Sequence, residues 1–212
     1  AALTTAQVAA IEVADVAALT SAQLQAIEVG DIPALTPSQI AALGTAQIDK
    51  LTAGQVAVLT TDQIQAIEVG DLPFMTTTQI EALTATQVAA LTVGQIAVLT
   101  KPQIAAIDAA DIPSLTTAQI AALTTAQVAA LTTAQIAALE TADLVKLGTA
   151  QIAALTTAQA EALTTAQVAN LTTAQIAALE TADLAALTTG SGLLLGVHRF
   201  AQLHRRLGER RQ

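Results

Sequence analysis

The chain lacks cysteine, tryptophan and tyrosine, and its 212 residues include only two phenylalanines and one methionine. Without cysteine it has no disulfide and no thiolate metal site, and its redox compartment is left open. Alanine is the commonest of its hydrophobic residues, so a core must be filled by small and branched aliphatic side chains. This composition favours backbone segments packed in a close, regular array over an ordinary globular core.

Charged residues are also few, at 12% of the chain, and they are unevenly distributed. Residues 1–190 carry sixteen carboxylates and three lysines, whereas residues 191–212 carry five arginines and one glutamate. An acidic body repels nucleic acid and anionic lipid, so we expect neither as a partner. No apolar run approaches the roughly 20 residues that cross a bilayer, and no signal peptide is recognisable.

An octapeptide recurs 23 times without insertion from residue 3 to residue 186. Its most regular form, Leu-Thr-Thr-Ala-Gln-Ile-Ala-Ala, stands at residues 115–122, and its positions are numbered 1 to 8 here. Position 1 is always Leu, Ile or Met, position 5 is Gln or Asp, and position 6 is branched aliphatic except at Ala160. We therefore expect a repeat domain over residues 1–189. Because the chain begins at position 7 of an octad, we interpret it as a piece or a processed form of a longer protein.

The octads argue against one long helix. Apolar positions alternate at spacings of five and three, and eight residues overshoot two α-helical turns by about 80°, so the apolar stripe would wander around a continuous helix. Prolines at 33, 37, 73, 102 and 113 also interrupt such a helix. A repeat without insertions is typical of a solenoid, in which every unit has the same rise and rotation.

Each octad carries the pattern of a helix start. With Thr at position 2 as N-cap, Gln at position 5 falls at N3 and completes a capping box, while positions 1 and 6 form a hydrophobic staple. Pro37 and Pro102 then fall in the first turn, where proline is tolerated. The pattern predicts an all-α solenoid of very short helices, about six residues each and one per octad. Such helices are marginal alone, so the unit is expected to be stable only in an array.

A β-solenoid with octads as half-coils is the alternative fold, since Thr, Ile and Val favour strands. It leaves the capping box and the abundant alanine unexplained. The small residue at position 4 is expected where another backbone comes close.

Six octads depart together at two positions, with an acid at position 2 and Asp at position 5. Pro33, Pro73 and Pro113 follow three of these aspartates and recur at every fifth octad, so a super-repeat of five octads is superimposed on the octad. The acid pairs are Glu12 and Asp15, Glu28 and Asp31, Glu68 and Asp71, Asp108 and Asp111, Glu140 and Asp143, and Glu180 and Asp183.

Two interpretations of the acid pairs are open. The first is an alternative chemistry of the first helical turn, in which carboxylates accept from free backbone N–H groups and suit the positive helix end. The second is calcium binding by these twelve residues, which needs carboxylates from different octads to converge. A paired-carboxylate hydrolase is disfavoured because a recurring pair indicates architecture rather than one cleft.

No other residues indicate catalysis or a cofactor. His198 and His204 have no matching cluster of acids or cysteines, so a metal site there is not expected. No nucleophile and base can be singled out among many equivalent threonines, and no glycine-rich phosphate loop is present. We expect no enzymatic activity.

The octad pattern stops at Gly190, and residues 190–212 form a basic tail with apolar residues at partly helical spacing. Three interpretations are open: a helix that caps the last coil, a basic amphipathic helix that binds a surface, or a non-native extension.

The repeat, as it stands at residues 115–122, resembles octapeptide arrays of very large bacterial surface or secreted proteins. The resemblance covers residues 3–186 and implies an extracellular structural role. We expect a stalk, spacer or fibre-forming segment that self-associates, since the two ends of an octad array are complementary. The alternative is a binding module that presents threonine or acidic ladders to ice, a carbohydrate or calcium.

Overall fold

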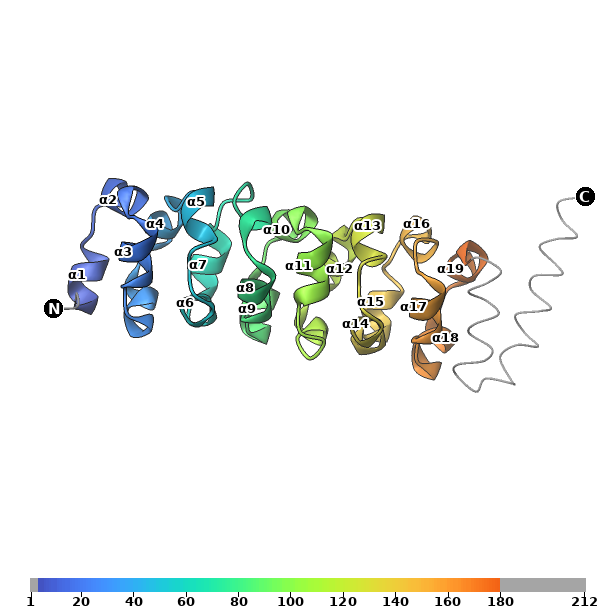
Figure 1. Ribbon diagram of the computed structural model, residues 1–212. Helices are drawn as coiled ribbons and strands as arrows, with labels where there is room; N and C mark the ends of the chain where they lie inside the picture. The colour runs from blue at the N-terminus through green and yellow to red at the C-terminus, as the bar shows by residue number, and fades with distance from the viewer. Residues whose placement is uncertain (1–3, 180–212) are drawn as a thin grey trace, which may run out of the picture. The chain divides into compact units, whose positions relative to one another are not determined.

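The computed structural model describes residues 4–179, and the chain divides into two compact units, Ala1–Ala122 and Leu123–Gln212. Each octad from residue 3 to residue 178 contributes one short α- or 3-10 helix, and residues 4–179 contain no strand (Figure 1). The predicted solenoid of very short helices is confirmed, and the β-solenoid is wrong. The unit boundary falls between two octads.

In the first unit the α-helices follow the octads in order, interrupted by three 3-10 helices. They are α1 (Thr5–Ala9), α2 (Val13–Ala18), α3 (Ser21–Gln25), η1 (Val29–Ala34), α4 (Pro37–Ala41), α5 (Thr45–Ile48), α6 (Ala53–Ala57), α7 (Thr61–Ala66), η2 (Leu72–Phe74), α8 (Thr77–Glu81), α9 (Ala85–Ala90), α10 (Val93–Val98), α11 (Lys101–Ala106), η3 (Ile112–Ser114) and α12 (Thr117–Ala122).

The described part of the second unit consists of seven further α-helices. They are α13 (Thr125–Val128), α14 (Thr133–Ala138), α15 (Thr141–Leu144), α16 (Thr149–Ile152), α17 (Thr157–Glu161), α18 (Thr165–Asn170) and α19 (Thr173–Ala178). None of the helices described in either unit is long and apolar enough to cross a membrane.

The predicted capping box is present where Thr occupies position 2. In octad 59–66, Thr60 Oγ1 accepts from the Gln63 backbone N–H at 3.2 Å, and Gln63 Oε1 accepts from the Thr60 backbone N–H at 2.8 Å. Thr60 is extended, with φ −72° and ψ 164°, so the chain turns there before the helix begins. Where Gly44 replaces Thr, the return bond survives, from the Gly44 N–H to Gln47 Oε1 at 3.1 Å.

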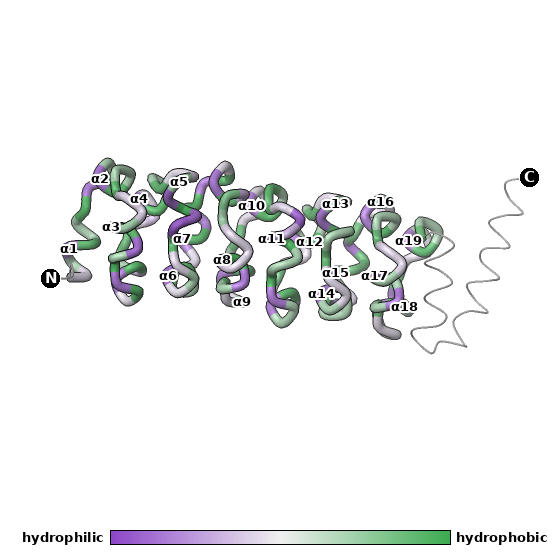
Figure 2. The backbone as a smooth tube through the Cα atoms, in the orientation of Figure 1, coloured by the Kyte–Doolittle hydropathy of each residue, from purple (hydrophilic) through white to green (hydrophobic). Residues whose placement is uncertain are grey.

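Positions 1 and 6 form the core in both units, as the staple predicts. Leu59 and Ile64 are 4% and 0% exposed, and Ala160, the exception at position 6, is also fully buried. Hydrophobic and hydrophilic residues accordingly alternate along every coil (Figure 2). Helices pack against the helix three octads further on, as α4 does against α7 and α13 against α16.

The surroundings of position 4 differ from those expected from the sequence. It is exposed at Ala46 and Gly54, so no backbone covers it there. A Cβ built on Gly54 meets the Val29 side chain at 3.6 Å, and one built on Gly94 meets the Val69 side chain at 4.0 Å. At Gly54 and Gly94 position 4 therefore adjoins a valine side chain from the preceding coil, not a backbone.

Candidate functional site

The amide side chain of the position 5 glutamine is buried between successive coils. Gln63 is 1% exposed, and a buried amide needs hydrogen-bond partners for both its oxygen and its nitrogen. Its Oε1 accepts from Thr60, whereas its Nε2 donates to the carbonyl oxygens of Ile32 at 2.8 Å and Leu35 at 2.6 Å. One side chain thus starts its own helix and binds the previous coil, where a coil is one turn of the solenoid. We call this arrangement the glutamine clamp.

The clamp recurs with constant offsets. Its two carbonyl partners lie 31 and 28 residues earlier, at position 6 four octads back and position 1 three octads back, so one turn of the solenoid holds between three and four octads. Both bonds are present for Gln47, Gln55, Gln79, Gln87, Gln95, Gln103 and Gln119 in the first unit and for Gln159, Gln167 and Gln175 in the second.

The first coil shows what the glutamine does without a described coil before it. Gln7 and Gln23 are exposed, although each keeps its capping bonds, whereas Gln39 is 1% exposed and donates to Ile11 O at 2.6 Å. Burial of the glutamine is therefore a product of coil stacking and not of the octad itself.

A signal for the clamp lies in the sequence, beyond the capping interpretation. A capping box accepts either Gln or Glu at N3, yet position 5 is never Glu. Only the amide carries N–H donors, so a strict choice of Gln over Glu indicates that a donor is needed at this position.

The position 2 acids lie on the surface and mostly do not cap. Glu12, Glu28 and Glu140 stand at N-caps without a side-chain cap bond. Asp108 is the exception, since its Oδ1 accepts from the Ala110 backbone N–H at 2.9 Å. The hydrogen bond of the first-turn interpretation is therefore present at Asp108, which precedes the turn at residues 109–111, and absent at the three glutamates, although each of these stands where a helix begins.

The position 5 aspartates differ in their surroundings. Asp15 is exposed, and Asp31 and Asp143 are buried. Asp31 accepts a hydrogen bond from the Thr5 hydroxyl at 2.5 Å, which joins α1 to η1.

Asp71 and Asp111 are partly buried, and both have altered acidity. Burial, and secondarily the charge of Glu68, raises the pKa of Asp71 above its ordinary value. Burial and the charge of Asp108 raise the pKa of Asp111 in the same way. In both octads the ionised carboxylate is disfavoured by its place in the fold.

The acid pairs are not gathered into a cluster of metal ligands. Within residues 4–179, no group of three or more His, Cys, Asp or Glu side chains could hold a metal ion. Acidic octads at 28, 68 and 108 are five octads apart, whereas a turn holds between three and four, so they do not stack over one another. The remaining pair, Glu180 and Asp183, lies outside the described residues, as do His198, His204 and the tail.

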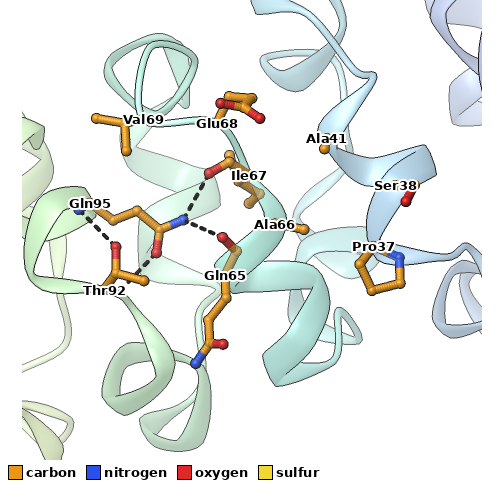
Figure 3. Close-up of a pocket in the computed structure, with 10 residues that line it drawn as sticks. All are labelled: Pro37, Ser38, Ala41, Gln65, Ala66, Ile67, Glu68, Val69, Thr92 and Gln95. Atoms are coloured by element: carbon orange, nitrogen blue, oxygen red, sulfur yellow. Dashed lines mark hydrogen bonds between the residues drawn. The ribbon is translucent and has the colours of Figure 1, made fainter.

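A surface hollow of about 350 Å³ lies between α4, α7 and α10 (Figure 3). The Gln95 clamp crosses it, with Nε2 2.9 Å from Ile67 O and 3.4 Å from Gln65 O. Its lining includes one carboxylate and no His, Cys or Lys, and consists of Pro37, Ser38, Ala41, Gln65, Ala66, Ile67, Glu68, Val69, Thr92 and Gln95. The hollow is a space between successive coils, bridged by the clamp.

A protein-family model matches the repeats of this chain. The ALTTAQ repeat model matches residues 24–61, 64–101, 104–141 and 136–173, which together make up more than half of the chain. The chain belongs to the ALTTAQ repeat family. No curated protein and no solved structure matches it.

The ALTTAQ matches follow the acidic octads. Each begins four positions before a position 2 acid, at Glu28, Glu68, Asp108 and Glu140. The first three matches begin five octads apart and the fourth begins four octads after the third, and the acids have the same spacings. Each match therefore contains one complete acidic octad near its start, followed by regular octads, and the match at residues 104–141 also takes in the first three residues of the next acidic octad.

Proposed function

We propose that the chain is a structural scaffold, a spacer or stalk segment whose length is set by its number of octads. The observation that carries the proposal is the constancy of the glutamine clamp. In the first unit at Gln47 and in the second at Gln175, the same side chain binds carbonyls at the same two offsets, 31 and 28 residues back. An array joined in this way gains or loses octads without a change in its local contacts.

We place this scaffold in a bacterial surface or secreted protein. The support is the resemblance of the octad, as at residues 115–122, to the octapeptide arrays of such proteins. Membership of the ALTTAQ family supports the repeat array itself.

The spacer role is tested by small-angle X-ray scattering on chains shortened by one, two and three whole regular octads. A spacer loses maximum dimension in equal steps, one for each octad removed. If the radius of gyration instead follows the weak power of length typical of compact domains, the proposal fails. Circular dichroism on each chain verifies that its helices are retained.

We extend the proposal to association of copies end to end. Gln7 and Gln23 accept through Oε1 in their capping boxes, and no residue among 4–179 accepts from their Nε2 atoms. These are the groups with which interior glutamines bind another coil. Sedimentation velocity over a range of concentrations should give assemblies that weaken in the Q7A/Q23A variant. A monomer at every concentration would contradict association.

A further inference from the structure

The acidic octads interrupt the series of clamps. On either side of octad 67–74, Gln63 binds Ile32 O and Leu35 O, and Gln79 binds Ile48 O and Leu51 O at 2.8 and 2.7 Å. Between them stands Asp71, whose carboxylate makes no hydrogen bond to another residue of the described chain. A carboxylate has no N–H to donate and is one methylene shorter than glutamine. The carbonyls of Ile40 and Leu43 lie at the clamp offsets from Asp71, 31 and 28 residues back. They therefore receive no amide donor from residue 71.

The same interruption occurs five octads further along the chain. Gln103 binds Leu72 O and Met75 O at 2.7 Å each, and Gln119 binds Leu91 O at 2.6 Å. Asp111 lies between these two clamps and, within the described chain, donates nothing to the carbonyls of Ile80 and Leu83.

These two octads also have less regular helical structure than their neighbours. Residues 69–71 and 109–111 form turns, followed by the short 3-10 helices η2 and η3, where the neighbouring octads have α-helices. Pro73 and Pro113 lie within these 3-10 helices and supply no backbone N–H. Glu68 and Asp108 replace the threonine N-cap, so the reciprocal Thr–Gln capping box cannot form. Each of these two octads lacks the reciprocal capping box, the α-helical turn and the clamp together.

We propose that the acidic octads at Asp71 and Asp111 are built-in weak points, where contact between coils opens before it opens in regular octads. The solenoid then yields in segments of about five octads, the interval that also separates the family matches beginning at residues 24, 64 and 104. Under heat, denaturant or tension, the chain opens in steps at defined places. The raised pKa values of Asp71 and Asp111 act in the same direction, since ionisation of either carboxylate disfavours the folded chain.

Amide hydrogen exchange followed by NMR on the full chain tests this, with two matched reporters. The Met75 N–H bonds to Leu72 O at 3.0 Å, at the end of the acidic octad, and the Leu59 N–H bonds to Val56 O at 3.1 Å, at the end of the regular octad 51–58. Octad 51–58 has its own clamp through Gln55, and the carbonyls of Val56 and Leu59 accept from Gln87. Met75 and Leu59 are both 4% exposed. Because opening free energies differ between regions of one protein, Met75 is expected to exchange about tenfold faster than Leu59, a ratio of the size that one lost hydrogen bond produces.

Two reciprocal variants keep the proposal falsifiable. E68T/D71Q restores the residues of the regular octad and should slow exchange at Met75. T84E/Q87D makes a regular octad acidic and should speed exchange at Leu91, whose N–H bonds to Val88 O at 3.3 Å. Equal exchange at Met75 and Leu59, or no change at Leu91 in T84E/Q87D, would overturn the proposal. Neither result bears on the spacer role, which the scattering series tests separately.

Discussion

Gln63 Nε2 donates to the Leu35 carbonyl at 2.6 Å, across 28 residues of chain. The same side chain accepts from Thr60, three residues before it, so the start of one helix and the contact with the previous coil share one amide group. Local helix formation is thereby coupled to coil stacking. This coupling explains how α-helices of four to six residues, which are too short to persist alone, are held in the array.

The two glycine N-caps give a stabilisation test. Gly44 and Gly148 occupy position 2, where threonine supplies a side-chain cap elsewhere. A Cβ at residue 44 meets nothing within 4 Å, whereas one at residue 148 lies 3.3 Å from Gln151 Oε1. G44T should therefore raise the free energy of unfolding by about 0.5 kcal/mol, from the added cap and the reduced freedom of the unfolded chain.

Thermal unfolding of both variants measures this. G148T should gain less than G44T, because its new Cβ crowds the amide of the capping box. A larger gain in G148T would contradict the capping geometry.

The raised pKa values of Asp71 and Asp111 predict a pH dependence. Each pKa lies above its ordinary 3.8 in the folded chain. The contribution of each group to stability is therefore full below about pH 3.8 and is lost as pH rises through the raised pKa. In D71N/D111N neither group ionises. The melting temperature of this variant minus that of the wild type should therefore increase between about pH 3 and about pH 7. A difference between the two chains that stays flat over this range would contradict the burial of these carboxylates.

Two deletions test whether the octad is the unit of structure. Removing residues 83–90 deletes one regular octad and leaves every later glutamine in phase with carbonyls four and three octads back. It also shortens the interval between Glu68 and Asp108 to four octads, the interval already found between Asp108 and Glu140. Circular dichroism should give an unchanged helical signal per residue.

Removing only residues 83–86 is the matched control. This deletion takes away Thr84, the N-cap of α9, and shifts every later octad by half a unit against the preceding coil. The helical signal and the sharpness of unfolding should both fall. Equal behaviour of the two deletions would show that the octad frame is not required.

Much of the fold follows from local pattern. The capping box at Thr60 and Gln63 and the burial of positions 1 and 6 depend on neighbours within one octad, so the sequence predicts them. The contact of Gln63 with Leu35 depends on how many octads form a turn, and no residue within one octad determines that number. For the same reason the approach of Val29 to Gly54 cannot be predicted from the octad.

The sequence identifies the acidic octads as coupled substitutions, but it does not show their consequence. Under one of the two open interpretations Glu12 and Glu28 accept from first-turn N–H groups, and neither side chain makes such a bond. What the change at position 5 removes is a donor to the previous coil, which becomes visible only once the clamp of a regular octad such as that of Gln79 is known.

The most direct test of the glutamine clamp compares Q63A with Q23A by denaturant unfolding. Both substitutions remove the same side chain from a capping box, but Gln63 also holds two carbonyls of the previous coil, whereas Gln23 is exposed. Q63A should lower the free energy of unfolding by about 2–4 kcal/mol, because it removes the amide donor of the Leu35 carbonyl and one of the two donors of the Ile32 carbonyl, which keeps the Leu35 N–H. Q23A should cost about 1 kcal/mol or less, as the loss of a cap does. Equal losses in the two variants would contradict the account, since the cross-coil bonds would then contribute nothing.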